Sequence, residues 1–334
     1  MFEGYRVVCV TPAGRRRYMK LLVPQILASP IVDRYDVWLN TNNAGDLAFL
    51  RQLPELDRTR PDRVRLIAQP DNLVPGWDAI AGFHRLAQDA DTIYVRLDDD
   101  VVWLEPGFFE TLLAFRIANP RYFLVMPLII NNAVCTHLLC TLGKIASSQF
   151  VGAVCMDPIG WRSSGFAIKL HRLFLELLAR GEAARLHCGA REIAMNRFSI
   201  NAICWFGRDF APFGGQVGAA EEEELSNLIP TRLGRSNCFC TDTIAAHFAF
   251  YVQRRALDRT DVLDAYARHL ATRAELRPLL DAAAELCAAI DADHPPMPVA
   301  KAPRRSWRTR LWSRWFRPRP APRQPVELGL GPSF

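Results

Sequence analysis

The sequence lacks the short motifs that identify several common classes of enzyme. It contains no GxSxG motif and no Walker A phosphate loop, so it indicates neither a serine hydrolase of the nucleophile-elbow type nor a P-loop nucleotidase. A GxGxxG fingerprint is also missing, which argues against a nicotinamide-binding Rossmann domain. Any catalytic chemistry must therefore come from a different pattern of residues.

Signals for export, membrane insertion and zinc binding are absent as well. The first residues, MFEGYRVVCVTPAGRRR, lack the order of a secretory signal, and no apolar run reaches the ~20 residues of a membrane span. The nine cysteines show no CxxC spacing, and most of them lie within apolar runs. An odd, dispersed set of this kind is typical of reduced thiols packed as small hydrophobic side chains. We therefore expect a cytoplasmic protein.

The net charge of +6 is concentrated near the C-terminus. Residues 301–323 hold many Lys and Arg residues and no acid, while the rest of the chain is close to neutral. We therefore expect no nucleic-acid partner for the globular part. The basic tail also contains Trp307, Trp312, Trp315 and Phe316. Arg with interfacial Trp favours peripheral contact with the inner face of the plasma membrane, and the alternative is a disordered extension that only solubilises the protein.

Short apolar runs alternate with helical segments through the first half of the chain. The predicted strands are residues 5–10, 35–39, 64–68, 92–97 and 122–127, and the helical segments between them are 18–27, 46–53 and 77–90. This alternation predicts βαβ units in an α/β fold with a mostly parallel sheet. Further on, residues 166–180 are predicted as a helix, 198–206 as a late strand, and 258–290 as one or two helices, whereas 133–165 show no clear period.

The fourth predicted strand runs directly into three acids, Asp98, Asp99 and Asp100. In open α/β sheets ligands bind at the carboxyl ends of the strands, which is where these acids lie. Strand alternation places Asp98 and Asp100 on the same side, with Asp99 pointing elsewhere. Two such carboxylates can share Mg²⁺ or Mn²⁺ with a diphosphate. The alternative is a solvated acidic turn that caps a helix at residues 106–115.

Residues 5–255 resemble the nucleotide-sugar-dependent glycosyltransferases of the GT-A fold, and most nearly the bacterial family-2-like enzymes. A first strand ends in a nucleotide-facing loop (VCVTPAGR), and a later strand runs into a DxD motif (YVRLDDD). An acidic cluster then opens a helix (EEEELSN), and a histidine follows in an apolar segment (AAHFAF). The resemblance implies a Rossmann-like GT-A sheet flanked by helices. It assigns residues 1–257 to a catalytic domain. The Ala- and Leu-rich composition that follows predicts a helical extension over 258–292, and the Pro-, Arg- and Trp-rich sequence of 293–334 predicts a disordered tail.

The resemblance also implies which residues form the donor site. The residues that would contact the nucleotide sugar follow the predicted strands: Thr11, Ala13, Arg15, Asn40, Asn42, Asp71, Trp77, Asp78, Arg96, Asp98 and Asp99. Asp98, Asp100 and His247 would hold Mn²⁺ or Mg²⁺. Taken without the resemblance, a single histidine among apolar residues is more often a core histidine than a metal ligand. Trp161 and the residues after it are a candidate acceptor contact, or simply the entry to the next helix.

The acidic cluster at 221–224 supplies the candidate catalytic base. In inverting relatives an acidic pair followed three residues later by leucine opens a helix beside the acceptor, and here Glu221, Glu222 and Leu225 fit that pattern. We assign the base to Glu222, although Asp is usual at this position and four consecutive acids leave Glu221 and Glu223 open. A base must lie within hydrogen-bond reach of the hydroxyl that it deprotonates. The alternative is a charged helix N-terminus stabilised by the helix dipole.

Together these features predict a metal-dependent, hexosyltransferase-like enzyme. It would move a sugar from a nucleoside diphosphate donor to an acceptor hydroxyl with inversion, in polysaccharide or glycolipid synthesis at the cell surface. One alternative is a sugar-phosphate nucleotidyltransferase, for which TPAGRRR is a poor version of the expected Gly-rich basic loop. Another is a non-catalytic nucleotide-sugar-binding module of the same fold.

Overall fold

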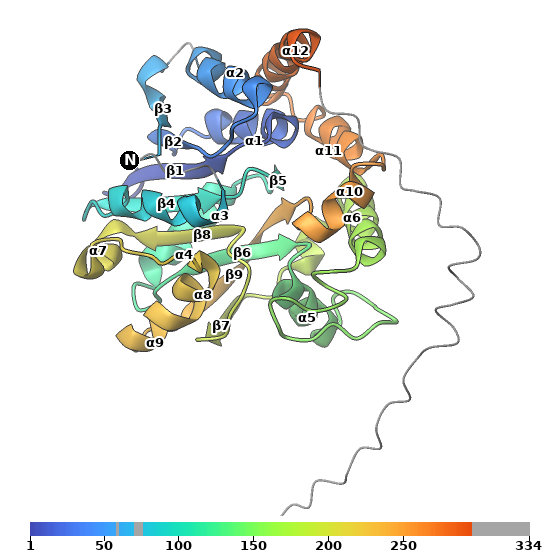
Figure 1. The fold of residues 1–334 in the computed structure, drawn as a ribbon. Coiled ribbons are helices and arrows are strands. Elements are labelled where there is room, and N and C mark those ends of the chain that lie inside the picture. Colours follow the sequence, from blue (N-terminus) through green and yellow to red (C-terminus); the bar gives the residue numbers. More distant parts are fainter. Residues whose placement is uncertain (58–59, 70–75, 296–334) are drawn as a thin grey trace, which may run out of the picture. The chain divides into compact units, whose positions relative to one another are not determined.

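A computed structural model describes residues 1–57, 60–69 and 76–295 of the chain, which belong to one compact unit. A nine-stranded sheet runs through this part (Figure 1). Its strands follow one another in space in the order β3-β2-β1-β4-β8-β6-β9-β5, with β7 paired to β9. The strands are β1 (Arg6–Ala13), β2 (Arg34–Leu39), β3 (Val64–Ile67), β4 (Thr92–Leu97), β5 (Val101–Leu104), β6 (Val125–Ile130), β7 (Ala190–Ala194), β8 (Ala202–Phe206) and β9 (Asn237–His247).

The N-terminal half of the sheet is entirely parallel. β1 pairs in parallel with β2 and with β4, and β2 pairs in parallel with β3. All six residues of β4 are buried, as are all but the first of β1, which explains why both read as continuous apolar runs. The α/β class, with a Rossmann-like sheet, is thus confirmed.

The C-terminal half of the sheet mixes both strand directions. β8 lies antiparallel to β4 and to β6, while β6 and β9 are parallel. β5 and β7 are antiparallel to β9. β5 begins only four residues after β4 ends, too short a connection for a parallel crossover, so the chain turns sharply at Asp98–Asp100 and enters a different part of the sheet.

Helices cover the sheet. They are α1 (Arg16–Ala28), α2 (Ala44–Gln52), α3 (Trp77–Ile80), α4 (Phe108–Ala118), α5 (Ala133–Thr141), α6 (Ser164–Ala179), α7 (Gly207–Phe210), α8 (Glu221–Glu223), α9 (Ile229–Leu233), α10 (Tyr251–Leu257), α11 (Val262–Leu270) and α12 (Arg277–Asp293). A π-helical turn over Glu224–Leu228 joins α8 to α9. Among the described residues, every helix is too short or too polar to span a lipid bilayer.

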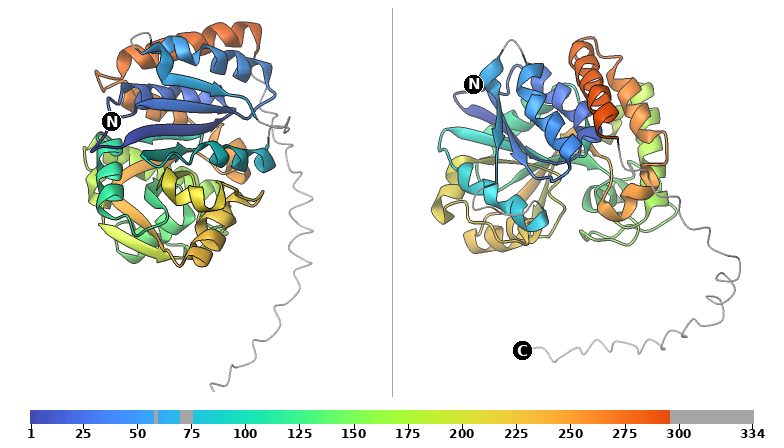
Figure 2. Two further views of the ribbon diagram at one scale, coloured as in Figure 1. Left: turned by 90° about the vertical axis from the view of Figure 1, so that its left-hand side faces the viewer. Right: turned by 45° about the horizontal axis from the view of Figure 1, so that its top comes forward.

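The C-terminal helix packs against the first two helices (Figure 2). Arg16, which is buried in α1, connects the three helices: its Nη1 lies 2.9 Å from Asp46 Oδ1 in α2, and its Nη2 lies 2.7 Å from Asp291 Oδ1 in α12. The Arg16 Nη2 also donates to the carbonyl oxygen of His294 at 3.0 Å. The division at residues 257 and 292 stays a prediction, and the tail from residue 296 lies outside the described residues.

Candidate active site

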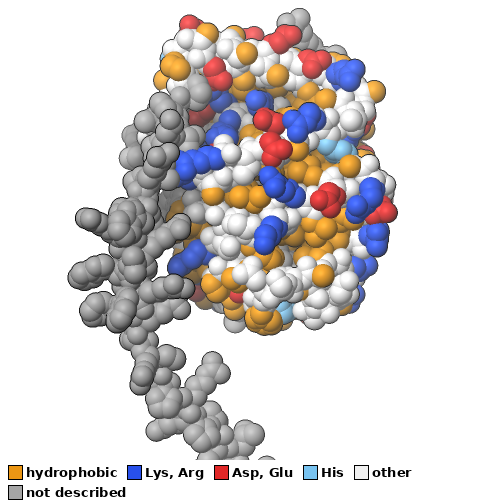
Figure 3. Space-filling model, turned by 90° about the vertical axis from the view of Figure 1, so that its right-hand side faces the viewer, with side chains coloured by type: hydrophobic (Ala, Val, Ile, Leu, Met, Phe, Trp, Pro, Cys, Tyr) orange, Lys and Arg blue, Asp and Glu red, His pale blue; other side chains and the backbone are white. Residues whose placement is uncertain are grey.

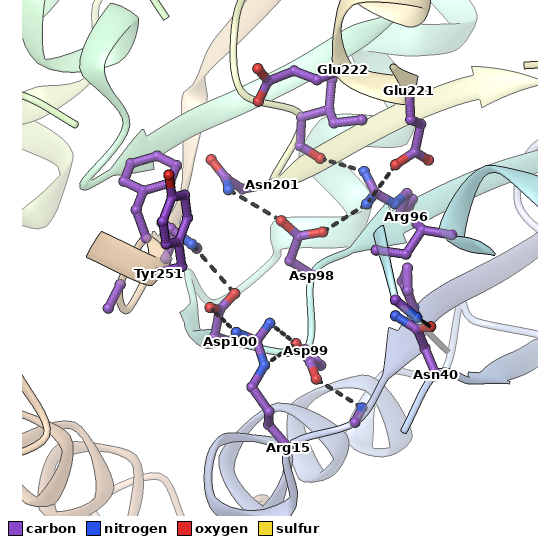
Figure 4. A pocket seen from close by; sticks show the side chains of 18 of the residues that line it. Arg15, Asn40, Arg96, Asp98, Asp99, Asp100, Asn201, Glu221, Glu222 and Tyr251 are labelled. Carbon is purple, nitrogen blue, oxygen red and sulfur yellow. Dashed lines mark hydrogen bonds and ion pairs between the residues drawn. The ribbon is translucent and has the colours of Figure 1, made fainter. Parts of the chain in front are cut away.

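The carboxyl ends of β1, β2 and β4 border a pocket of about 560 Å³. Loops after these three strands form one side of it, and α8 and the β9–α10 connection form the other. Figure 3 shows the face on the right of Figure 1, where acidic and basic side chains lie close together across the middle of the molecule. Figure 4 shows Asp98 pointing toward Arg96, and Asp99 and Asp100 pointing toward Arg15, inside the pocket.

The turn between β4 and β5, formed by Asp98–Asp100 and called the aspartate turn below, is fixed by backbone hydrogen bonds at both ends. The Asp98 amide donates to the Asn201 carbonyl oxygen at 2.8 Å, and the Phe248 amide donates to the Asp100 carbonyl oxygen at 2.8 Å. Asp99 turns toward β1, where its carboxylate accepts from the Gly14 amide at 2.8 Å and pairs with the Arg15 guanidinium. Asp98 and Asp100 therefore face the pocket from one side of the turn, while Asp99 fastens the turn to the first loop.

The two pocket-facing aspartates have different partners. Asp98 Oδ1 lies 2.9 Å from Arg96 Nη2, and its Oδ2 accepts from Asn201 Nδ2 at 3.1 Å. Asp100 Oδ2 lies 2.8 Å from Arg15 Nη1 and 3.2 Å from Arg254 Nη2. Asp100 Oδ1, in contrast, is buried without a hydrogen-bond donor.

These environments separate the acidities of the two carboxyl groups. Burial raises the pKa of Asp98 to about 6, with Arg96 opposing the rise and Asp100 adding to it. Burial also acts to raise the pKa of Asp100, but Arg15, His247 and Arg254 together hold it well below its ordinary value. Asp100 is therefore the more acidic of the two carboxyl groups.

Asp98, Asp100 and His247 fit a divalent cation. One ligand atom from each of the three residues lies within 4.8 Å of the others. His247 Nδ1 faces the Asn131 carbonyl oxygen at 3.2 Å, which leaves Nε2 directed at Asp100 Oδ1, 3.4 Å away. The Oδ1 atom without a donor is the strongest sign of fit, because a buried carboxylate oxygen ordinarily has a partner. Carboxylate oxygens are typical ligands of hard divalent cations, and an imidazole is a ligand that transition-metal cations accept.

The three candidate base residues have separate surroundings. Glu221 is buried, and its oxygens lie 2.8 Å from His84 Nε2 and 3.3 Å from Arg96 Nη2. Burial acts to raise the pKa of Glu221, but Arg96 and His84 outweigh it and lower the pKa. Glu222 lines the pocket with a side chain that is 28 % exposed. Glu223 does not line the pocket.

Glu222 is oriented by two neighbours. Its Oε1 lies 3.0 Å from Arg197 Nη2 and accepts a hydrogen bond from Cys155 Sγ at 3.0 Å. Burial, reinforced by Glu222, raises the pKa of the Cys155 thiol to about 12, so this thiol stays a donor at neutral pH. The carboxylate is thereby held at the pocket wall opposite the aspartate turn, as Figure 4 shows.

The structure brings together some of the other predicted donor-site residues. Arg15, Arg96, Asp99 and Asn40 line the pocket, and Asn40 Oδ1 accepts from the Gly76 amide at 2.8 Å. Pro12 of β1 and Gly14 of the following loop also line the pocket, whereas Thr11 and Ala13 are fully buried in β1 and do not line it.

The remaining predicted residues do not contribute described side chains to the pocket. Asn42 is exposed on the loop after β2 and is not among the lining residues. Asp71 lies outside the described residues. Trp77 and Asp78 open α3 with their backbones, but their side chains lie outside the described part of the chain.

Sequence reasoning missed three polar residues of the pocket: Arg197, Asn201 and Arg254. None of the three belongs to a motif that the sequence revealed. Arg197 and Asn201 come from the segment before β8, and Arg254 comes from α10, and only the fold brings these segments beside the aspartate turn. Trp161, a candidate acceptor contact, does line the pocket, where its ring lies edge-on to Tyr251 with centroids 5.4 Å apart. The two aromatic rings are thus in contact within the pocket lining.

Comparisons with known proteins give only distant similarities. No family model matches the chain, and no curated protein matches it. A mannosyltransferase from Pyrobaculum calidifontis, solved with GDP-mannose and Mn²⁺, is 14 % identical over 88 % of this chain and 77 % of its own, with a TM-score of 0.45. A CMP:2-keto-3-deoxy-manno-octonic acid synthetase complexed with CTP is 11 % identical over 72 % of this chain and 90 % of its own, with a TM-score of 0.38.

A third similar structure is the bifunctional glycosyltransferase WbbM, 9 % identical over 84 % of this chain and 52 % of its own, with a TM-score of 0.39. Similarities this weak do not identify a reaction. The GT-A-like fold is supported by the chain itself. The aspartate turn, the acidic start of α8 and His247, which the sequence resemblance singled out, meet in one pocket.

Proposed function

We propose that this protein is a metal-dependent glycosyltransferase that moves a sugar from a nucleoside diphosphate-sugar to an acceptor hydroxyl. The observation that carries the proposal is the meeting of a cation-binding cluster and a separate carboxylate in one pocket. Asp98, Asp100 and His247 form the cluster, and Glu222 lies on the opposite wall. A divalent cation held by the cluster would supply positive charge to the diphosphate leaving group.

We assign the catalytic base to Glu222. In the proposed single displacement, the acceptor oxygen bonds to the anomeric carbon while the bond from that carbon to the diphosphate oxygen breaks. The nucleoside diphosphate leaves with the electron pair, the acceptor proton passes to Glu222, and the anomeric configuration inverts. Glu221 is a poorer candidate because both of its oxygens are engaged, and Glu223 because it lies away from the pocket.

We place the nucleoside near the carboxyl ends of β1 and β2. Gly14 and Asn40 line that end of the pocket, and a Cβ on Gly14 would lie 2.8 Å from the Asn40 carbonyl oxygen. Glycine thus allows these two loops to approach closely. The remaining donor contacts of the sequence prediction, including Asp71, Trp77 and Asp78, stay part of the proposal.

The exposed apolar side chains at and near the pocket support an acceptor substrate with an apolar part. Met156 lines the pocket and is 56 % exposed, and Tyr251 lines it and is 53 % exposed. Phe150, at 82 %, and Val154, at 56 %, lie on the same loop as Met156. Large apolar side chains are rarely left this exposed in a group, and such groups mark interaction sites. We therefore propose a glycolipid or lipid-linked glycan acceptor, with a cytoplasmic enzyme that contacts the inner membrane surface through its basic tail.

The products of the reaction separate this proposal from its alternatives. The protein is incubated with a panel of nucleotide sugars and Mn²⁺, with and without alkyl glycoside acceptors. Release of nucleoside diphosphate supports glycosyl transfer, whereas a requirement for sugar phosphate and nucleoside triphosphate, with release of pyrophosphate, identifies a nucleotidyltransferase. Tight donor binding without turnover on any acceptor identifies a binding module.

A matched pair of variants ties the activity to the pocket. Asp100→Ala should abolish release of nucleoside diphosphate. Asp242→Ala removes an exposed carboxylate from the same strand that carries His247 and should leave it unchanged. Full turnover by Asp100→Ala would overturn the proposal.

A further inference from the structure

The two carboxylate oxygens of Asp100 have different neighbours. Arg15 and Arg254 both contact Oδ2, while Oδ1 has no donor and faces His247. The two arginines thus hold the carboxylate with one oxygen directed toward the cation cluster. They also place positive charge beside the position of a cation, which weakens its binding as long as they stay there.

Arg15 and Arg254 are held with different strength. Arg15 pairs with Asp99 as well as Asp100, so it has two carboxylate partners at the base of the turn. Arg254 has one carboxylate partner, Asp100, and its Nη2 also lies 3.4 Å from the Ala249 carbonyl oxygen. Its Nε is buried without a hydrogen-bond partner, although a guanidinium offers five N–H donors. Of the two arginines that contact Asp100, Arg254, which lines the pocket, is therefore the one with more donors left for a ligand.

The described charges of the pocket are close to balance. They comprise five carboxylates and four guanidinium groups: Asp98, Asp99, Asp100, Glu221 and Glu222, with Arg15, Arg96, Arg197 and Arg254. A divalent cation alone would leave an excess of positive charge here, and a diphosphate alone would deepen the negative charge. The two ligands together come closest to the existing balance, so the electrostatics favour their joint binding.

We propose that Arg254 binds the diphosphate of the donor and, by leaving Asp100 to do so, couples nucleotide binding to cation binding. The inference rests on the proposed function, since it concerns the same pocket. The guanidinium exchanges one charged oxygen partner for another, so no buried charge loses its partner. Asp100 then keeps Arg15 on Oδ2 and gains affinity for the cation. Arg254 is a substrate-binding residue that also controls cation affinity.

Calorimetry on the full-length protein tests the coupling directly, with Mn²⁺, UDP and GDP as probes. In the wild type, Mn²⁺ alone should bind weakly, and one nucleoside diphosphate should bind much more tightly with Mn²⁺ than without it. Arg254→Met should bind Mn²⁺ alone at least roughly threefold more tightly, because a neighbouring positive charge is gone. The same variant should bind the nucleoside diphosphate with Mn²⁺ ~10–100-fold more weakly, because a charge-assisted hydrogen bond is lost.

The opposite signs of these two effects distinguish coupling from damage to the fold. Arg255→Met removes the same charge from the next residue of α10, which does not line the pocket, and should change neither affinity. Arg254→Lys keeps the charge with fewer donors and should lie between wild type and Arg254→Met. If Arg254→Met lowers the affinity for Mn²⁺ alone and for the nucleoside diphosphate by equal factors, or changes neither affinity, the proposed coupling is wrong while the proposed function stands. If the wild type binds neither nucleotide with Mn²⁺, both fail.

Discussion

Glu222 and Glu223 are neighbours in the sequence and share one partner, Arg197. The Arg197 Nη2 lies 3.0 Å from Glu222 Oε1, and its Nη1 lies 3.3 Å from Glu223 Oε2. Only Glu222 lines the pocket. The two residues therefore form a natural pair for testing which carboxylate carries the chemistry, because they share residue type, helix turn and ion-pair partner.

We expect Glu222→Gln to reduce glycosyl transfer by roughly 10²–10⁴-fold, because the amide cannot accept the acceptor proton. Binding of the donor should persist, since the aspartate turn is untouched. Glu223→Gln should keep nearly full activity. Steady-state rates and donor affinity measured on both variants check this prediction. Equal losses of transfer rate in the two variants would show that Glu222 is not the catalytic base.

Glu221 should matter for stability in a way that its neighbours do not. It is buried between His84 and Arg96, so Glu221→Gln leaves the buried Arg96 with one carboxylate fewer. Breaking a buried ion pair costs roughly 3–5 kcal/mol of unfolding free energy. Glu223→Gln should lower the free energy of unfolding by only about 0–1 kcal/mol, because the Glu223 side chain is 46 % exposed. Urea denaturation of the two variants gives the comparison, and similar midpoints would contradict it.

Two adjacent glycines before the acidic cluster should respond differently to alanine. Gly214 and Gly215 have φ of +61° and +59°, but a Cβ on Gly215 would lie 2.2 Å from the His84 carbonyl oxygen, while one on Gly214 meets nothing within 4 Å. Gly214→Ala should cost only the left-handed backbone strain of about 1–2 kcal/mol. Gly215→Ala adds a backbone clash worth ~1–3 kcal/mol more. Thermal unfolding of both variants tests the difference.

His171 should make the protein sensitive to mild acid. It is fully buried, with Nδ1 2.9 Å from the Tyr266 hydroxyl and Nε2 2.9 Å from the Phe248 carbonyl oxygen. Burial lowers the pKa of His171 to about 4, below its ordinary value of 6.5. The unfolded chain therefore binds the proton more readily, and stability that is complete above pH ~6.5 falls by up to about 3 kcal/mol as the pH drops toward 4.

The control for this pH effect is His171→Gln, which has no proton to gain. Its free energy of unfolding should be lower than that of the wild type at pH 7 but should change less between pH 6.5 and 4. Denaturation curves measured at several pH values give both slopes. Parallel slopes would show that His171 does not contribute to the acid sensitivity.

The sequence predicted the parallel half of the fold because β1 and β4 are buried on both faces and appear as apolar runs. It did not predict α5, since a helix that is buried on several sides has no clear period. It also missed β7, a mostly exposed strand defined only by its pairing with β9. The predicted helix at 77–90 is α3 followed by a 3-10 turn over Ala81–Leu86.

The pocket residues also divide into those that a local sequence pattern predicts and those that only the fold brings together. Asp98 and Asp100 were predictable because their spacing at a strand end has a chemical reason. The close approach of His247 was implied only by resemblance to relatives. Arg254 was not predictable, since nothing in its local sequence indicates that α10 begins beside the aspartate turn. Long-range packing brings such residues to the pocket, and the local sequence around them does not reveal that packing.

The central claim is that Asp98, Asp100 and His247 bind a divalent cation together with a nucleoside diphosphate. Anomalous diffraction at the manganese edge, from crystals grown with Mn²⁺ and GDP or UDP, tests it most directly. The account predicts a manganese peak in contact with these three side chains and with the diphosphate oxygens. A nucleotide bound in the pocket with no manganese signal at the three residues would contradict it.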